Sequence, residues 1–265
     1  MNLVPDPPFS QTGIATGPAL HSCVPRLPMG DIASPVYPNN ALTIQKNSRP
    51  EMAKREPALT RDAFLELRLG DMLHVISESY AYKTESYYSI LRHELDGEKV
   101  MPASSAILDA SVVPLCLERA RLAKIPVCDW GISQGYVPLP SILYGLNYFA
   151  STAAYCIVHD EKQAKEAVRH LTNCGKYPVC YQKIPAGATI STCISVFGKT
   201  AGTGEGVAQL AKQVYDLFGI PLVTLVIVAD GDSCRLSSLA PTRYCRLSPA
   251  ERSLLLAYLN HQEFL

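Results

Sequence analysis

The stretch from residue 72 to residue 103 constrains the fold of this chain most strongly. The apolar run "MLHVIS" (72–77) predicts a buried strand, residues 85–95 have helical spacing that stops at "DG", and "EKVMPAS" predicts a second strand. A strand, a helix and another strand within about 30 residues are typical of a βαβ unit, in which the two strands are parallel. The sequence therefore predicts an α/β (α+β) fold with a mixed, partly parallel sheet, βαβ units and flanking helices.

The second half of the chain alternates between strands and helices in the same way. Strands are expected at "AAYCIV", "YPVCYQKI" and "TISTCISVFG", with two more around the hairpin signal "ADGDS", the first of them apolar throughout and therefore central. Helices are expected over 159–175, over 204–219 and over 248–262. Ser248 and Glu251 form a capping box that marks the start of the last helix.

Three earlier segments have weaker signals. A short helix is expected over "TRDAFLELRL", with its apolar residues facing inward. Residues 104–123 are predicted to be helical with a kink or a break at Pro114, because proline cannot continue the hydrogen bonding of a helix. Residues 125–152, rich in glycine, proline and aromatic residues, are predicted to form an ordered but irregular connection.

Residues 1–57 differ in composition from the rest of the chain. They contain ten of its twenty prolines and almost no apolar periodicity. Proline fixes its own backbone and biases the preceding residue away from helix, so this segment is predicted to be a disordered tail. Residues 58–265 are then expected to form a single domain, which is long enough to bury a core.

The composition argues against several classes of protein. Lys+Arg and Asp+Glu both total 24, and a neutral chain has no overall field that attracts nucleic acid or anionic lipid. The nine cysteines include no C-x-x-C pair, which argues against a structural metal site and indicates a reducing compartment. No apolar run is long enough to cross a bilayer. The chain is therefore expected to be cytoplasmic, with no nucleic-acid or membrane partner.

No motif predicts catalysis or a cofactor. "FGKTAGTGEG" (197–206) contains the Gly-Lys-Thr of a P-loop, but Cys193 stands where a P-loop has its first glycine, and the helix begins several residues late. A flexible linker is the better interpretation of this segment. The six histidines are scattered singly, and no serine or cysteine lies in a nucleophile motif. We therefore expect no catalytic residue, no metal and no cofactor.

Tyrosines gather between residues 77 and 88, in "SESYAYKTESYY". Tyr87 and Tyr88 lie in the expected helix, where at least one of them should pack against the sheet. Tyr80 and Tyr82 precede the helix and follow the carboxyl end of a strand, which is where open parallel sheets bind their ligands. With Lys83 beside them, this turn fits either a structural aromatic plug or a recognition surface.

The same residues carry a family resemblance. "HVISESYAYKTESYYSILRHELDGEKVMPASSAILD" (74–109) resembles the start of the RLAN domain, which precedes the ligase domain in RimK-like ATP-grasp ligases. The matching positions, in order along the chain, are Tyr80, Tyr82, Tyr87, Tyr88, Val100, Pro102 and Asp109. The likeness extends over about residues 72–260. It implies an RLAN-like α/β domain over 58–265, and its candidate substrate- or partner-binding residues are Tyr80, Tyr82, Lys83, Tyr87, Tyr88 and Asp109.

Two departures from the family bear on function. The family usually carries a basic residue between its first two tyrosines, where this chain has Ala81, and Glu78 lies just upstream. The late strand "CRLSSLAPTRYC" has no acidic residue that could hold the magnesium of an ATP-grasp site. The resemblance therefore implies a relative of the accessory domain that lacks the catalytic one.

The leading hypothesis is a stand-alone, non-catalytic accessory or substrate/partner-binding module. It would be linked to RimK-like ATP-grasp ligation of peptides or amino acids, and its partner would be an ATP-grasp ligase or a peptide substrate. Two alternatives stay open. The chain is one part of a split ATP-dependent carboxylate-amine ligase, or it is a small enzyme with a site in the turn 77–88, assisted by "DWGISQGY" (129–136).

Overall fold

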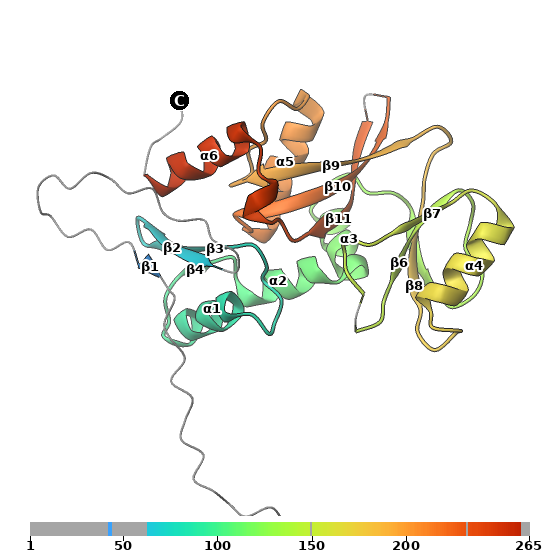
Figure 1. The fold of residues 1–265 in the computed structure, drawn as a ribbon, viewed down its shortest axis with the longest axis horizontal. Coiled ribbons are helices and arrows are strands. Elements are labelled where there is room, and N and C mark those ends of the chain that lie inside the picture. Colours follow the sequence, from blue (N-terminus) through green and yellow to red (C-terminus); the bar gives the residue numbers. More distant parts are fainter. Residues whose placement is uncertain (1–41, 44–62, 149, 232, 261–265) are drawn as a thin grey trace, which may run out of the picture. The chain divides into compact units, whose positions relative to one another are not determined.

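The computed structural model of the chain describes residues 42–43, 63–148, 150–231 and 233–260, all within one compact unit, Asn40–Leu265 (Figure 1). This unit has the mixed α/β fold that the sequence predicts. The tail predicted over residues 1–57 lies outside the described residues, apart from two that form a short strand. Among the described helices, none is long and apolar enough to cross a membrane.

The first sheet contains the predicted βαβ unit. Its strands, in spatial order, are β1 (Leu42–Thr43), β2 (Phe64–Leu69), β3 (Met72–Ser77) and β4 (Val100–Met101). Strand β3 is parallel to β4 and antiparallel to β2. Helix α1 (Glu85–Leu95) connects β3 to β4 and has the predicted bounds. The hydroxyl of Thr84 caps α1 by accepting the backbone N–H of Tyr87, so the turn that precedes the helix is fixed at its end.

Strand β2 corrects a prediction. Residues 64–69 of the short helix expected over "TRDAFLELRL" form this strand, which pairs with β3 along its whole length. Phe64 packs in one buried cluster, and Leu65 and Leu67 pack in another. A strand that is buried on both faces has apolar residues at consecutive positions, and here that pattern is similar to the apolar stripe of a helix.

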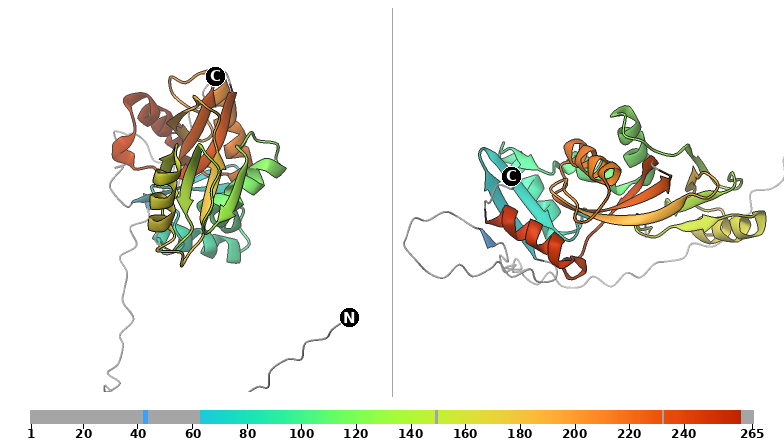
Figure 2. Two further views of the ribbon diagram at one scale, coloured as in Figure 1. Left: turned by 90° about the vertical axis from the view of Figure 1, so that its right-hand side faces the viewer. Right: turned by 90° about the horizontal axis from the view of Figure 1, so that it is seen from above.

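The second sheet is antiparallel, and its middle strand is the one predicted to be central. It contains β9 (Thr189–Val196), β10 (Leu222–Asp230) and β11 (Ser233–Ala240), in the order β11-β10-β9. These strands, orange to red, run side by side in both views of Figure 2. The hairpin predicted at "ADGDS" joins β10 to β11.

Helices cover both faces of this sheet. Helix α5 (Glu205–Phe218) buries Leu210 and Val214 in one cluster with residues of β10 and β11. It ends at Gly219, whose φ of 65° and whose contact with Met101, 2.7 Å from where a Cβ would lie, both require glycine. Helix α6 (Pro249–Leu259) packs in the cluster that contains residues of β9, and both hydrogen bonds of its predicted capping box are present.

The predicted break near Pro114 separates two helices, α2 (Ser104–Ser111) and α3 (Val113–Leu122). Val112 between them is extended, with a φ of −114° and a ψ of 108°. Pro114 lies in the first turn of α3, where its missing N–H costs no helical hydrogen bond. The two helices pack in the core cluster that also contains α1 and α5.

The third sheet corrects a second prediction. It contains β5 (Trp130–Ser133), β6 (Ser141–Gly145), β7 (Cys156–Val158) and β8 (Val179–Lys183), in the order β5-β8-β6-β7. Strands β5 and β6 lie in the segment 125–152, which was expected to be irregular. Glycine at position 131 fits the strand because the hydroxyl of Tyr181 lies 2.5 Å from where a Cβ would be.

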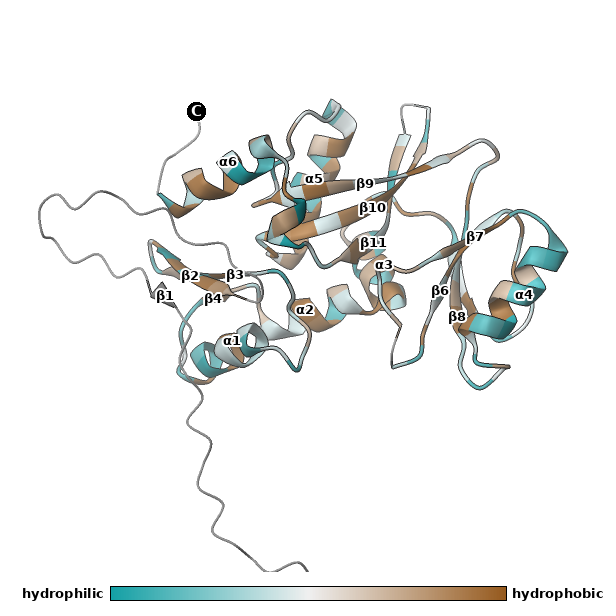
Figure 3. Cartoon of the chain, viewed as in Figure 1, coloured by the Kyte–Doolittle hydropathy of each residue, from teal (hydrophilic) through white to brown (hydrophobic). Residues whose placement is uncertain are grey.

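Helix α4 (Glu161–Leu171) covers one face of the third sheet. Its buried residues Ala164 and Val168 pack with Leu143 and Val179, and hydrophilic residues line its other side (Figure 3). The remaining element, the 3-10 helix η1 (Tyr244–Arg246), follows β11.

Buried polar groups join the second sheet to the third. The Tyr144 and Ser237 hydroxyls are 2.8 Å apart, and the Gln182 side-chain amide donates to the Ser237 carbonyl at 2.8 Å. Because buried polar groups are costly without partners, these bonds fix how β11 sits on β6 and β8.

Candidate functional site

The turn between β3 and α1 is held in place by one buried tyrosine. The Tyr80 side chain is 8% exposed, and its hydroxyl accepts the N–H of Ser77 at 3.0 Å and donates to the carbonyl of Val75 at 3.1 Å. Burial raises the pKa of this hydroxyl well above its usual value, so Tyr80 stays neutral. We call residues 77–88 the tyrosine turn; Tyr80 ties it to the end of β3.

In each of the two tyrosine pairs, Tyr80 with Tyr82 and Tyr87 with Tyr88, one side chain is buried and the other is exposed. Tyr87 is buried in the same core cluster as Tyr80, which confirms that at least one of the helical tyrosines packs inward. Tyr88 is 55% exposed and Tyr82 is 45% exposed. The turn is therefore both an aromatic plug, through Tyr80 and Tyr87, and an exposed aromatic surface, through Tyr82 and Tyr88.

Tyr82 belongs to a surface cluster with Lys83 and Tyr148. The hydroxyls of the two tyrosines share a hydrogen bond, and their rings are 6.3 Å apart at an angle of 72°. The Lys83 ammonium lies 5.3 Å from the centre of the Tyr82 ring and 5.1 Å from that of Tyr148, within the range of a cation–π contact. Tyr148 is 61% exposed, so the cluster faces solvent.

Hydrogen bonding within this cluster shifts two pKa values in opposite directions. The hydrogen bond from Lys83, and then the one from Tyr82, lower the pKa of the Tyr148 phenol below its usual value of 10.0. The same contacts with Tyr148 and Tyr82 raise the pKa of Lys83. The Lys83 ammonium therefore stabilises the ionised form of the Tyr148 phenol, and it places a positive charge beside the two hydroxyls.

An apolar cavity lies beside the tyrosine turn, with Ser79, Tyr80 and Ala81 in its lining. It has a volume of about 110 Å³ and is lined mainly by apolar side chains, among them Ile107, Ile220 and Leu239. Thr152, four positions after Tyr148 in the chain, also lines it. The tyrosine turn therefore contributes to both features, Ser79 to Ala81 to the cavity and the next two residues to the cluster.

Asp109, a candidate residue, and Glu78, which lies in the turn, both have partners outside the cluster. Asp109 forms an ion pair with Arg119 at 2.9 Å, which links α2 to α3. Glu78 accepts the backbone N–H of Tyr244 at 2.6 Å, which links the turn to η1. Neither of these contacts neutralises Lys83.

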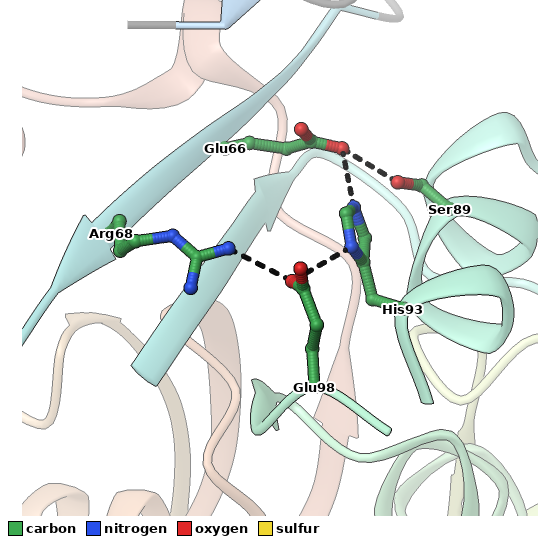
Figure 4. A network of polar contacts seen from close by, with 5 residues as sticks. All are labelled: Glu66, Arg68, Ser89, His93 and Glu98. Atoms are coloured by element: carbon green, nitrogen blue, oxygen red, sulfur yellow. Dashed lines mark hydrogen bonds and ion pairs between the residues drawn. The ribbon is translucent and has the colours of Figure 1, made fainter. Parts of the chain in front are cut away.

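A polar network fixes the position of α1 against the first sheet (Figure 4). His93 lies between two carboxylates, with Nε2 3.4 Å from Glu66 and Nδ1 3.1 Å from Glu98. Ser89 donates to Glu66 at 2.6 Å, and Arg68 pairs with Glu98 at 2.9 Å. Because these residues come from β2, α1 and the chain just before β4, the network holds the βαβ unit that carries the turn.

The segment "FGKTAGTGEG" packs against helices at its start. The Phe197 ring stacks on that of Tyr258 at 4.2 Å, and Gly198 leaves room for Tyr215, 2.9 Å from where a Cβ would lie. Helix α5 begins only at Glu205. Among the residues that the structure describes, no group of three or more His, Cys, Asp or Glu side chains could hold a metal ion.

The sequence reasoning missed Tyr148. In the small-enzyme alternative, the turn was expected to be assisted by "DWGISQGY" (129–136). However, residues Trp130–Ser133 of that segment form β5 in the third sheet. The side chain that reaches the turn comes instead from "GLNYFAST", beyond β6. The available signal in the sequence was a pair of adjacent aromatic residues, at positions 148 and 149, in a segment predicted to be irregular.

Comparisons with known proteins gave structural likenesses only. No family model matches the sequence, and no curated protein matches it. The similar solved structures include a RimK domain ATP-grasp protein from Sphaerobacter thermophilus DSM 20745, with 18% identity, a TM-score of 0.48, and coverage of 64% of this chain and 74% of that one.

Two further similar structures are ligases. The ATP-grasp ligase PsnB, complexed with the precursor peptide PsnA2 and AMPPNP, has 15% identity, a TM-score of 0.48, and coverage of 67% of each chain. The D-alanine-D-alanine ligase from Helicobacter pylori has 14% identity, a TM-score of 0.47, and coverage of 64% of this chain and 65% of that one. At these identities and TM-scores, the likenesses assign no activity and no site residue to this chain.

Proposed function

We propose that this chain is a non-catalytic accessory module of RimK-like ATP-grasp ligation, with an RLAN-like domain over residues 58–265 that binds a peptide or a partner protein at the tyrosine turn. The observation that carries the proposal is the Tyr82–Lys83–Tyr148 cluster beside the apolar cavity, at the carboxyl end of β3. In open sheets this is where ligands bind.

The chemistry of the site favours a peptide. Exposed tyrosines supply a large contact area at a small cost in side-chain entropy, which is why they are common at recognition surfaces. The cavity of about 110 Å³ suits a small aliphatic side chain. The Lys83 ammonium and the two hydroxyls beside it suit a carboxylate or carbonyl group next to that side chain.

The candidate residues have different parts in this proposal. Tyr82, Lys83 and Tyr148 contact the ligand, and Tyr88 extends their exposed surface. Tyr80 and Tyr87 shape the turn from inside, and Asp109 positions α2, one wall of the cavity, through its ion pair with Arg119.

One observation favours a second candidate function, that of a small enzyme. A phenol with a lowered pKa beside an ammonium is an arrangement that acid–base catalysis uses. The split-ligase alternative uses the same surface, with a separate ATP-grasp chain as the partner.

A peptide selection tests the proposal. The full chain would be used to select binders from a displayed library of random heptapeptides, and the best sequence would then be titrated as a soluble synthetic peptide. We expect Tyr82→Ala and Tyr148→Ala each to weaken its affinity about tenfold or more. Tyr136→Ala is the matched control, because Tyr136 is an exposed tyrosine of the third-sheet segment, outside the cluster and the cavity. Failure to select any peptide that depends on Tyr82 or Tyr148 would contradict the proposal.

Assays with Mg-ATP separate the candidate functions. The accessory module is expected to show no ATP hydrolysis, with or without the selected peptide. Turnover by the chain alone that disappears in Tyr148→Phe would instead support an enzyme. ATP-dependent ligation that appears only when a separate ATP-grasp chain is added would support the split ligase.

A further inference from the structure

The chain between α3 and β5 brings two cations to one cavity. The Pro126 carbonyl accepts the N–H of Leu236 at 2.8 Å, and the Asp129 carbonyl accepts the N–H of Lys183 at 2.8 Å. These bonds fix Arg235, which precedes Leu236 on β11, and Lys183, at the end of β8. Both side chains line a cavity of about 280 Å³ that shares no lining residue with the tyrosine turn. Backbone hydrogen bonds therefore place both basic residues at the same cavity.

Arg235 has a donor that the described residues leave unsatisfied. Its Nη1 atom is buried and has no hydrogen-bond partner among them. Asp230 forms an ion pair with this atom at 3.9 Å, which is too long for a hydrogen bond. A buried guanidinium nitrogen without an acceptor costs free energy, and the described residues do not fully pair this guanidinium. The side chain as a whole is 27% exposed, so a ligand in the cavity contacts it through atoms other than the buried Nη1.

The lining of the cavity has two basic side chains and one acidic one, and Asp230, which lies outside the lining, partly offsets the charge of Arg235. Burial raises the pKa of the Cys128 thiol more than the charge of Arg235 lowers it, so this thiol stays protonated at neutral pH. Asp129 is the acidic residue of the lining, against two basic ones. A planar guanidinium with a second cation nearby is the combination by which proteins recognise phosphate and carboxylate.

We propose that this cavity is an oxyanion-binding site for the phosphate or carboxylate group of a ligand, with Arg235 as the main donor and Lys183 as the second. The site is separate from the peptide-binding surface described above and does not depend on its function.

The fluorescence of Trp130 can report anion binding at this cavity. This residue is the only tryptophan of the chain, and it follows Asp129. The full chain would be titrated with inorganic phosphate and, separately, with acetate, while chloride keeps the ionic strength constant so that general screening does not change. A saturable change in Trp130 fluorescence, confirmed by titration calorimetry, is expected with at least one anion. The anion that binds more tightly shows whether phosphate or carboxylate is the natural group.

Variants of opposite effect make the test specific. Arg235→Gln is expected to weaken anion binding about tenfold or more, because a charge-assisted hydrogen bond is lost. Asp129→Asn is expected to strengthen binding, since it removes a negative charge from the cavity. Lys162→Gln, which removes one positive charge from the surface of α4, is expected to leave the affinity unchanged.

Two results would overturn the proposal. One is the absence of a saturable response to either anion. The other is an affinity in Arg235→Gln that equals that of Lys162→Gln. Circular dichroism confirms that each variant folds, and if Arg235→Gln does not fold, Lys183→Gln makes the same comparison with a smaller expected loss.

Discussion

Tyr80 and Tyr82 lie two positions apart in one turn, yet their surroundings differ completely. Tyr80 is 8% exposed and bonds to the backbone of β3, whereas Tyr82 is 45% exposed and bonds to another surface side chain. The same residue type therefore stabilises the fold at one position and is available to a ligand at the other. The difference shows that the tyrosine turn has a buried half, Tyr80 and Tyr87, and an exposed half, Tyr82 and Lys83, which Tyr148 completes.

Replacing one tyrosine of each half by alanine should give the largest difference between the halves in the free energy of unfolding. Tyr80→Ala is expected to lower the free energy of unfolding by about 3–5 kcal/mol, because it leaves a cavity in the core and unpaired backbone groups in β3. Tyr82→Ala is expected to change it by less than about 1 kcal/mol. Urea denaturation followed by circular dichroism measures both values. A loss in Tyr82→Ala as large as that in Tyr80→Ala would remove the distinction between the halves.

The buried half also depends on the network that holds α1. His93→Ala is expected to lower the free energy of unfolding by about 1–3 kcal/mol, because Glu66 and Glu98 lose a shared partner. Lys99→Ala is the control, since its ion pair with Asp71 is exposed and contributes little. Equal urea midpoints for the two variants would show that the network does not stabilise the βαβ unit.

The pH dependence of stability should follow a buried histidine of β3. Burial lowers the pKa of His74 below its usual value of 6.5, so at mildly acidic pH the unfolded chain binds a proton that the folded chain does not. Stability is then lost as pH falls below 6.5, with a slope of at most about 1.4 kcal/mol per pH unit. The effect is measured by comparing the urea midpoints of wild type and His74→Gln at several pH values, from mildly acidic to neutral. Parallel curves for the two proteins would show that His74 does not contribute.

The exposed half should titrate at a shifted pH and contribute little to stability at neutral pH. The phenol of Tyr148 is expected to ionise below 10.0, since its hydrogen bond from Lys83 lowers its pKa. Lys83→Gln is expected to return this titration to higher pH and to leave the urea midpoint unchanged. Ultraviolet difference titration of wild type against Tyr148→Phe isolates the one phenol. An unchanged Tyr148 titration in Lys83→Gln would mean that the cluster does not form in solution.

The sequence predicts those parts of the fold that depend on local signals. The bounds of α1, the capping box of Ser248 and Glu251, and the end of α5 at Gly219 all follow from residues within a few positions of each other. Strand β2 was mistaken for a helix because burial on both of its faces removes the alternation that marks a strand.

The site is less predictable because long-range contacts complete it. Its position at the end of β3 follows from the βαβ pattern, but Tyr148 is 66 positions away from Tyr82 in the sequence. The burial of Tyr80 in place of Tyr82 goes with hydroxyl bonds to the backbone of Ser77 and Val75, which only the folded turn brings within reach.

The most direct test compares the affinity of the selected heptapeptide for Tyr80→Phe and for Tyr82→Ala. Tyr80→Phe keeps the ring that lines the cavity and removes only the hydroxyl that anchors the turn. We expect it to bind the peptide within about twofold of wild type at a lower free energy of unfolding. Tyr82→Ala is expected to bind about tenfold more weakly with nearly unchanged stability. The opposite result, with affinity lost in Tyr80→Phe and kept in Tyr82→Ala, would contradict the assignment of recognition to the exposed half of the turn.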